Sequence, residues 1–151
     1  MNTREAVLIH VRDLAFIGKA GSNHWTSVDS AHRGKIPAAT SPMEMVLIAL
    51  GGCTGGDVAS ILEKKRVKFS KLEIKVSGVR TEIDPQVYTS IHIDYTVEGR
   101  HVREKDVAHA VELSMTKYCS VGAMLKKSVT LTHALTVVDT GGREGDSTQG
   151  D

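Results

Sequence analysis

The sequence is poor in the features that nucleic-acid-binding proteins share. Aromatic residues make up 4% of its 151 residues, so it offers no platform of rings on which bases could stack. The formal net charge is +1, which gives no electrostatic reason to bind nucleic acid or an acidic membrane surface. We therefore expect neither nucleic acid nor a membrane among its partners.

Long apolar runs are also missing. No stretch approaches the roughly 20 apolar residues that a membrane-spanning helix needs. Residues 1–5 are polar, and the apolar run that follows them is too short for a secretory signal. These two absences predict a cytoplasmic protein.

Cysteine is scarce, with Cys53 and Cys119 as the whole supply of thiols. A fixed structural disulfide is unusual in the cytoplasm, so the two residues are either inert members of the core or a redox pair. The seven histidines are scattered without the spacing of metal ligands. The sequence therefore predicts no metal site.

Periodicity predicts an α+β fold. Alternating apolar residues predict strands at 6–11, 14–18, 24–29, 72–79, 87–97 and 129–138. Helical spacing predicts helices at 41–62 and 103–118, and a short helix at 120–127 that Ser120 caps. Strands joined by tight turns imply a mostly antiparallel sheet, with helices on one face. The length predicts one domain over 1–139, and the glycine-rich, charged residues 140–151 predict a disordered tail.

The chain is organised around the helix at 41–62. Ser41 and Pro42 suit the N-cap and first helical positions, and Glu44 in the first turn suits the helix dipole. Four glycines interrupt this helix, and together they cost about 3–4 kcal/mol in helix propensity. The four are Gly51, Gly52, Gly55 and Gly56. They indicate either close approach of a second helix or a second subunit, or a helix broken at 51–52 that places Cys53 near a new helix start.

Both cysteines lie beside small residues at or in helices. A helix start next to a thiol lowers its pKa, because amide dipoles favour the thiolate. Asp57 follows Cys53 by one turn on the same face, where a carboxylate raises the thiol pKa unless a cation intervenes. Asp57 is better explained by hydrogen bonding to a polar neighbour or a backbone group than by catalysis.

Two motifs resemble one family. Residues 41–53, SPMEMVLIALGGC, look like the signature helix of the OsmC/Ohr family of thiol-dependent hydroperoxide reductases. Residues 117–121, KYCSV, look like the segment that holds the second cysteine of that family. The resemblance covers about residues 5–139, including strand order and the separation of the cysteines, and is closest to the YhfA-like branch.

The resemblance implies a mechanism and an assembly. It implies an intertwined homodimer with two central helices buried and an OsmC-like fold. Cys53 would be the peroxidatic cysteine, which attacks a hydroperoxide and becomes sulfenic acid, and Cys119 would resolve it as a disulfide. A dithiol reductant of the dihydrolipoyl-protein type would restore both thiols, without metal or cofactor. Organic hydroperoxides would be the substrate, and oxidative or osmotic stress defence the role.

Two further residues follow from the same resemblance. The family uses an Arg to hold the thiolate and a Glu to orient that Arg. Arg33, eight residues before Ser41, has a spacing that resembles the OsmC branch, and its alternative is a solvated loop charge. Glu44 departs from the Ohr pattern, which has Glu directly after the Pro. Nine residues before Cys53, it lies about 180° away around a straight helix, so it either serves the dipole or the other subunit's site.

Two other readings remain open from the sequence. A non-peroxidatic relative would act as a thiol sensor or bind a small apolar or electrophilic molecule. An inert structural domain would keep both cysteines in its core, unreactive until the protein unfolds.

Overall fold

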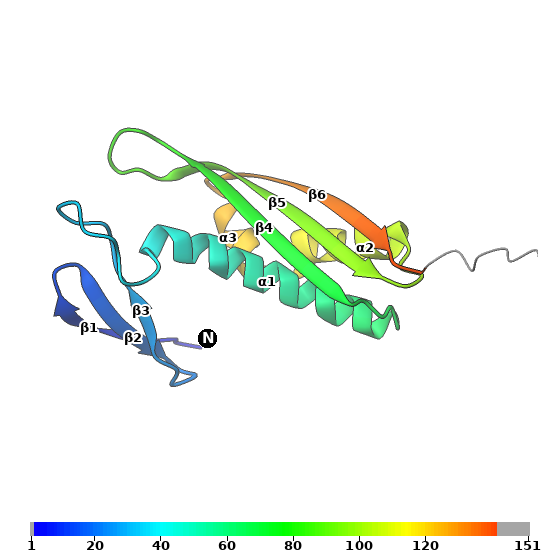
Figure 1. The fold of residues 1–151 in the computed structure, drawn as a ribbon, viewed down its shortest axis with the longest axis horizontal. Helices are drawn as coiled ribbons and strands as arrows, with labels where there is room; N and C mark the ends of the chain where they lie inside the picture. The colour runs from blue at the N-terminus through cyan, green and yellow to red at the C-terminus, as the bar shows by residue number, and fades with distance from the viewer. Residues whose placement is uncertain (1, 142–151) are drawn as a thin grey trace, which may run out of the picture. The chain divides into compact units, whose positions relative to one another are not determined.

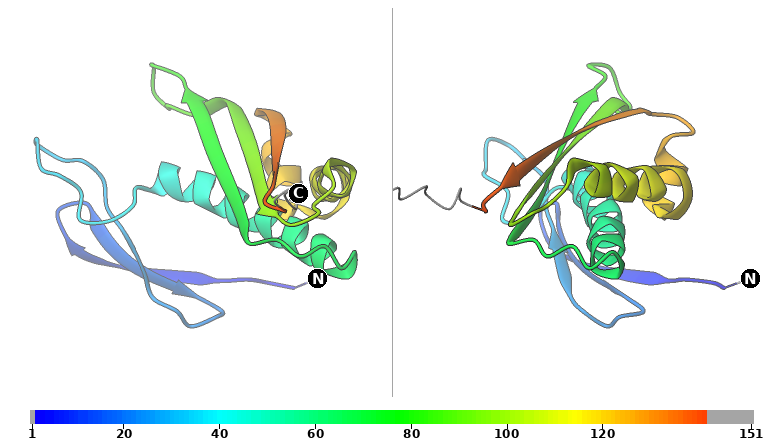
Figure 2. Two further views of the ribbon diagram at one scale, coloured as in Figure 1. Left: turned by 45° about the vertical axis from the view of Figure 1, so that its right-hand side comes forward. Right: turned by 90° about the vertical axis from the view of Figure 1, so that its right-hand side faces the viewer.

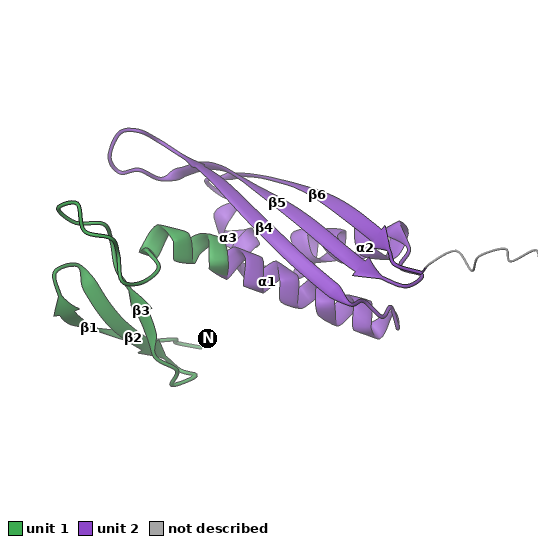
Figure 3. Ribbon diagram, viewed as in Figure 1, with its two compact units in different colours: residues 1–48 green, residues 49–151 purple. Residues whose placement is uncertain are grey.

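The computed structural model describes residues 2–141, which fall into two compact units divided between Ile48 and Ala49 (Figure 3). Most of the predicted tail, residues 142–151, lies outside the described range. Thr140 lies inside it, and its backbone N–H donates to the Gly99 carbonyl at 3.0 Å. The prediction of a single domain over 1–139 concerns how the two units fit together and stays a prediction.

The N-terminal unit holds a three-stranded antiparallel sheet. Its strands are β1 (Ala6–Arg12), β2 (Ala15–Ala20) and β3 (Thr26–Val28), in the order β1-β2-β3 (Figure 1). The three strands predicted here are confirmed, with small shifts at their ends. Every residue of β1 is exposed, and its four large apolar side chains are each 50–58% exposed. These are Val7, Leu8, Ile9 and Val11.

A capping box starts the long helix α1 (Pro42–Lys64). The Glu44 backbone N–H donates to Ser41 Oγ at 3.3 Å, and the Ser41 backbone N–H donates to Glu44 Oε2 at 2.8 Å. The two residues thus satisfy each other's free groups at the helix start. The bond from the Ser41 backbone, with that from its side chain, lowers the pKa of the Glu44 carboxyl. The predicted cap at Ser41 is confirmed.

Helix α1 runs through its glycines without a break, so the alternative of a helix broken at Gly51–Gly52 is wrong. A Cβ at Gly51 would lie 3.2 Å from a methyl of Val76, and one at Gly55 would lie 3.1 Å from Ile74. Both neighbours belong to strand β4 (Lys71–Arg80) of the same chain. The close approach at these two glycines is therefore made by a strand, not by the second helix or subunit predicted. A Cβ at Gly52 or Gly56 would meet nothing within 4 Å.

The length of α1 corrects another expectation. By length and composition alone, this helix of 23 residues is apolar enough to cross a membrane. The expectation that the sequence contains no stretch of this kind is therefore wrong. Four residues spaced four apart are buried: Leu50, Thr54, Val58 and Leu62. A helix buried along one stripe is typical of a helix that packs on its own protein.

The second unit has a mixed sheet with helices on one face (Figure 2). Strands β4 (Lys71–Arg80), β5 (Tyr88–Gly99) and β6 (Thr130–Asp139) lie in the order β4-β5-β6. Strand β5 alternates, with Ile91, Ile93, Tyr95 and Val97 buried, as its sequence predicts. The β4–β5 pair is antiparallel, but β6 runs parallel to β5. Tight turns predict antiparallel neighbours, but β6 can pair parallel to β5 because the chain between them is a helical crossover.

That crossover contains three helical segments. The helix predicted over 103–118 consists of α2 (Glu104–Leu113) and a π-helical turn η1 (Ser114–Tyr118), and α3 (Ser120–Leu125) follows. Cys119, in an extended conformation, is the N-cap of α3, and its sulfur accepts from the Gly122 backbone N–H at 3.3 Å. The predicted cap at Ser120 is wrong by one residue, since Ser120 is already helical. The second thiol therefore lies at a helix start.

Candidate thiol site

Two thiols and a carboxylate meet in the second unit. Cys53 Sγ, Cys119 Sγ and a carboxylate oxygen of Asp57 all lie within 4.8 Å of one another. Helix α1 supplies Cys53 and Asp57 from adjacent turns of one face, and the junction of η1 and α3 supplies Cys119. The structure thus brings together two thiols that are 66 residues apart, which the sequence alone left open.

The two thiols have different surroundings. Cys53 is half-buried, whereas Cys119 is 3% exposed. Burial raises the pKa of the Cys119 thiol to about 11, and neighbouring Cys53 and Asp57 act in the same direction. The N–H of Gly122 opposes this but does not outweigh burial. The expectation that a helix start lowers the thiol pKa is therefore wrong for Cys119, which is protonated at neutral pH.

A buried chain of hydroxyl groups ends at Asp57. Ser114 Oγ donates to Asp57 Oδ2 at 2.8 Å. Because the single Ser114 proton is used there, Thr54 must donate to Ser114 across 2.8 Å. By the same reasoning, Tyr95 must donate to Thr54 across 2.6 Å. Burial raises the pKa of the Tyr95 phenol, which keeps its proton in place. The chain therefore runs Tyr95 to Thr54 to Ser114 to Asp57.

This chain of hydrogen bonds gives Asp57 its polar partner, and it contains three residues that the sequence patterns did not reveal. The expectation that Asp57 has a polar hydrogen-bond partner is confirmed by Ser114. Thr54, Ser114 and Tyr95 were not singled out, and all three are 0% exposed. One signal was present: Thr54 lies in the otherwise apolar row of Leu50, Val58 and Leu62. A polar residue in such a row needs a buried partner.

A cleft of about 280 Å³ opens beside Asp57. Its walls are mostly apolar and come from α1, α2 and η1: Asp57, Ser60, Ile61, Lys64, Leu113 and Tyr118. Tyr118 directly precedes Cys119. Lys64 follows Asp57 by seven residues, which places it two turns along the same face of α1. The cleft thus reaches the Asp57 side of the thiol site, with a cation on its wall.

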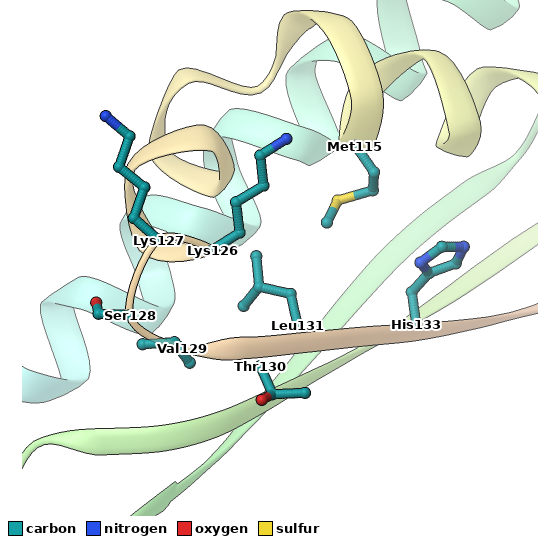
Figure 4. Close-up of a pocket in the computed structure, with 8 residues that line it drawn as sticks. All are labelled: Met115, Lys126, Lys127, Ser128, Val129, Thr130, Leu131 and His133. Carbon is teal, nitrogen blue, oxygen red and sulfur yellow. The ribbon is translucent and has the colours of Figure 1, made fainter.

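Another cavity, of about 550 Å³, lies between η1 and β6 (Figure 4). Figure 4 shows Met115, Leu131 and His133 gathered over β6, with Lys126 nearby. Neither cysteine lines this cavity, and Asp57 does not line it either. We therefore do not assign it to the thiol site.

Arg33 and Glu44 lie in the N-terminal unit. Arg33 is exposed in a tight turn with φ of 50°. Glu44 closes the capping box of α1, which gives its carboxylate a structural role. Their predicted roles beside Cys53 join the two units and stay predictions.

Comparisons with known proteins agree on the family. The OsmC-like protein family model matches residues 32–134. Protein YhfA of Escherichia coli K12 is 44% identical over 128 residues, covering 85% of this chain and 93% of YhfA. A crystal structure of a hypothetical protein from Aquifex aeolicus is 34% identical, with a TM-score of 0.81 over 91% of this chain and 97% of that one. An organic hydroperoxide resistance protein OsmC from Legionella pneumophila has the same fold, with 10% identity and a TM-score of 0.66 over 91% of this chain and 98% of that one. The chain therefore belongs to the OsmC-like protein family.

Proposed function

We propose that this protein is a thiol-dependent peroxidase that reduces organic hydroperoxides in the cytoplasm. The observation that supports it most is the approach of the two sulfur atoms, within 4.8 Å in the reduced state. A disulfide has a sulfur–sulfur bond of about 2.0 Å, so side-chain rotation and a small backbone shift suffice to form one.

The proposed cycle has three steps. The Cys53 thiolate attacks one oxygen of ROOH, the O–O bond breaks, and the protonated leaving group is ROH. Cys53 is then a sulfenic acid. The Cys119 thiol attacks its sulfur, forming the disulfide and releasing water. A dithiol of the dihydrolipoyl-protein type reduces the disulfide by exchange and becomes a disulfide itself.

The assignment of roles rests on exposure and charge. The attacking group must be reached by substrate and must be a thiolate. Cys53 is the more exposed thiol, whereas Cys119 is buried with a pKa of about 11. Cys119 is thus suited to the second step, in which the target sulfur is already beside it. Arg33 is proposed to hold the Cys53 thiolate, as the resemblance to the OsmC branch implies.

The cleft beside Asp57 supports the proposed substrate class. Ile61, Leu113 and Tyr118 give its wall an apolar character, which favours an organic hydroperoxide over hydrogen peroxide. A protein of the same fold bears the name organic hydroperoxide resistance protein. The name YhfA of the curated relative specifies no activity.

The test is a count of thiols and products. Fully reduced protein is mixed with one equivalent of cumene hydroperoxide per chain. We expect loss of two thiols and formation of one cumyl alcohol per chain, with recovery by dihydrolipoamide. Slow loss of a single thiol without stoichiometric alcohol would instead favour a thiol sensor or a small-molecule binder. Thiols that react only after denaturation would contradict both.

We also propose that the active protein is a homodimer. Strand β1 exposes Val7, Leu8 and Ile9 by half or more, and such a sheet is stable in water only when covered. The open side of α1 at Gly52 and Gly56 lets a second helix approach closely. Sedimentation equilibrium of the reduced protein should give twice the chain mass of 16.3 kDa. A monomer at micromolar concentration would refute the dimer.

A further inference from the structure

The thiol site contains a set of atoms that peroxide reduction does not require. A thiol peroxidase needs two sulfurs, but here a carboxylate oxygen lies within 4.8 Å of both. For the thiolate, this carboxylate is unfavourable by charge. For a cation, the same three atoms form one side of a coordination shell. Among the residues that the structure describes, no other group of three histidine, cysteine or acidic side chains converges in this way.

The atoms fit a soft divalent cation of the zinc class. Zinc takes thiolate sulfur at about 2.3 Å and carboxylate oxygen at about 2.0–2.2 Å in a tetrahedron. Two sulfurs at that distance are about 3.8 Å apart at the tetrahedral angle. The present separations are at most 4.8 Å, so the two sulfurs need to approach by no more than about 1 Å to share a zinc ion. Magnesium and calcium prefer shells of oxygen alone, so the two sulfurs select against them.

The surroundings orient two of the three ligands. Ser114 donates to Asp57 Oδ2, which leaves Oδ1 and the remaining lone pairs of Oδ2 for a metal. That bond is the last in the buried chain of hydrogen bonds that starts at Tyr95, and this chain fixes the position of the Asp57 carboxylate. The Gly122 N–H fixes the sulfur of Cys119 in the same manner. Hydrogen bonds behind the ligands are a common property of metal sites in proteins.

We propose that the reduced protein binds one Zn²⁺ per chain through Cys53 Sγ, Cys119 Sγ and the Asp57 carboxylate. The fourth position is left to water or a small ligand that enters by the cleft lined by Ile61 and Tyr118. This departs from the expectation, drawn from the sequence, that no metal is held. It uses the two thiols of the proposed reaction but does not depend on that reaction.

Metal binding and disulfide formation exclude each other. The two zinc-bound thiolates lose two electrons to the hydroperoxide and form the disulfide. The hydroperoxide takes up those electrons with two protons, its O–O bond breaks, and ROH and water result. Zn²⁺ is released because a disulfide is not a ligand. The reduced site therefore holds zinc, and oxidation of its thiols releases it.

The test is titration of fully reduced, metal-free protein with Zn²⁺, followed by competition with a chromophoric chelator. We expect one equivalent bound per chain. Co²⁺ in place of Zn²⁺ should give the near-ultraviolet band of thiolate-to-cobalt charge transfer. The Cys53→Ser and Cys119→Ser variants should each weaken that band and lower zinc affinity at least about 100-fold, since each removes a ligand.

Asp57→Asn separates this proposal from simple dithiol chelation. An asparagine can still accept the Ser114 hydrogen bond, but its amide oxygen is a poorer zinc ligand, so we expect affinity to fall at least about tenfold. Asp57→Glu keeps a carboxylate and should lose less. Glu63→Gln, an exposed change on the same helix, is the matched control and should leave affinity unchanged.

Some results would overturn the proposal. These are unchanged affinity in Asp57→Asn, or binding that survives loss of Cys119. Failure here is distinct from failure of the peroxidase, because thiol and alcohol counts are made on metal-free protein. If both hold, one equivalent of cumene hydroperoxide should release the bound zinc to the chelator.

Discussion

Replacing Cys53 with serine is expected to lower the rate of cumene hydroperoxide reduction by at least about 1,000-fold, as removal of a catalytic nucleophile does in other enzymes. Serine is nearly the same size as cysteine, but its hydroxyl is not ionised near neutral pH and is not oxidised by hydroperoxides. Because Cys119 is 3% exposed with a raised pKa, it should not take over the attack. The measurement is alcohol formation under single-turnover conditions.

Cys119→Ser is the matched comparison, since both variants lose one thiol. It should keep the first step within a few fold of wild type and form one alcohol per chain. The sulfenic acid at Cys53 then has no resolving thiol and should accumulate, where a dimedone-type reagent traps it. Turnover with a dithiol should fall strongly. Equal loss of the first step in both variants would contradict the assigned roles.

The same pair of variants gives a pH test. In Cys53→Ser the remaining thiol is Cys119, whose pKa in the wild type is raised from 9.0 to about 11, mainly by burial. The variant keeps this burial and loses the smaller contribution of Cys53, so the pKa stays raised. A thiol carries its charge when deprotonated, so a raised pKa means that the folded state keeps its proton. In the wild type, stability from this group is therefore present below pH 9 and is lost as pH rises through about 11. Alkylation of Cys119 should remain slow at pH 8–9, and the unfolded chain should react faster. Rapid alkylation of the folded variant at pH 8 would contradict the burial of the sulfur.

Many strands and helices could be predicted from the sequence, because their positions depend on the pattern of nearby residues. Strand β5 alternates along its length, and Ser41 with Glu44 forms the reciprocal cap that starts α1. The parallel pairing of β5 with β6 was not accessible, since a crossover is a property of the route taken by the chain. The π-helical turn at 114–118 has no distinct sequence pattern either.

The sequence motifs pointed to the two cysteines of the candidate site, but not to the polar residues that form hydrogen bonds beside them. The motifs around Cys53 and Cys119 identified both residues, and the structure brings them together. Ser114 falls within the helix predicted over 103–118, which does not reveal that its hydroxyl donates a hydrogen bond to Asp57. Such bonds join residues 57 positions apart, so no local spacing reveals them. The N-cap of α3 is Cys119 and not Ser120 as predicted. Serine is the commoner N-cap residue, but here the extended backbone before the helix ends at Cys119 and Ser120 is already helical.

Replacing Thr54 with valine is expected to destabilise the fold by about 2–4 kcal/mol, although the two side chains have nearly the same shape. Thr54 is the middle link of the buried chain, accepting from Tyr95 and donating to Ser114. Valine does neither. The Tyr95 proton is then left without an acceptor in a fully buried site, and Ser114 loses a donor. The measurement is urea-induced unfolding of reduced wild type and variant at equal protein concentration, because the stability of the proposed dimer would depend on concentration.

Two further variants separate the hydrogen bonds from packing. Thr54→Ser keeps the hydroxyl and loses one methyl group, so it should cost only about 1 kcal/mol. Adding Tyr95→Phe to Thr54→Val removes the orphaned hydroxyl, and should recover about 1 kcal/mol relative to Thr54→Val alone. Loss of the bond between Tyr95 and Thr54 predicts this recovery, because Tyr95→Phe removes the buried hydroxyl that Thr54→Val leaves without this partner. If the double variant is less stable than Thr54→Val, the orphaned Tyr95 hydroxyl is not the source of the cost.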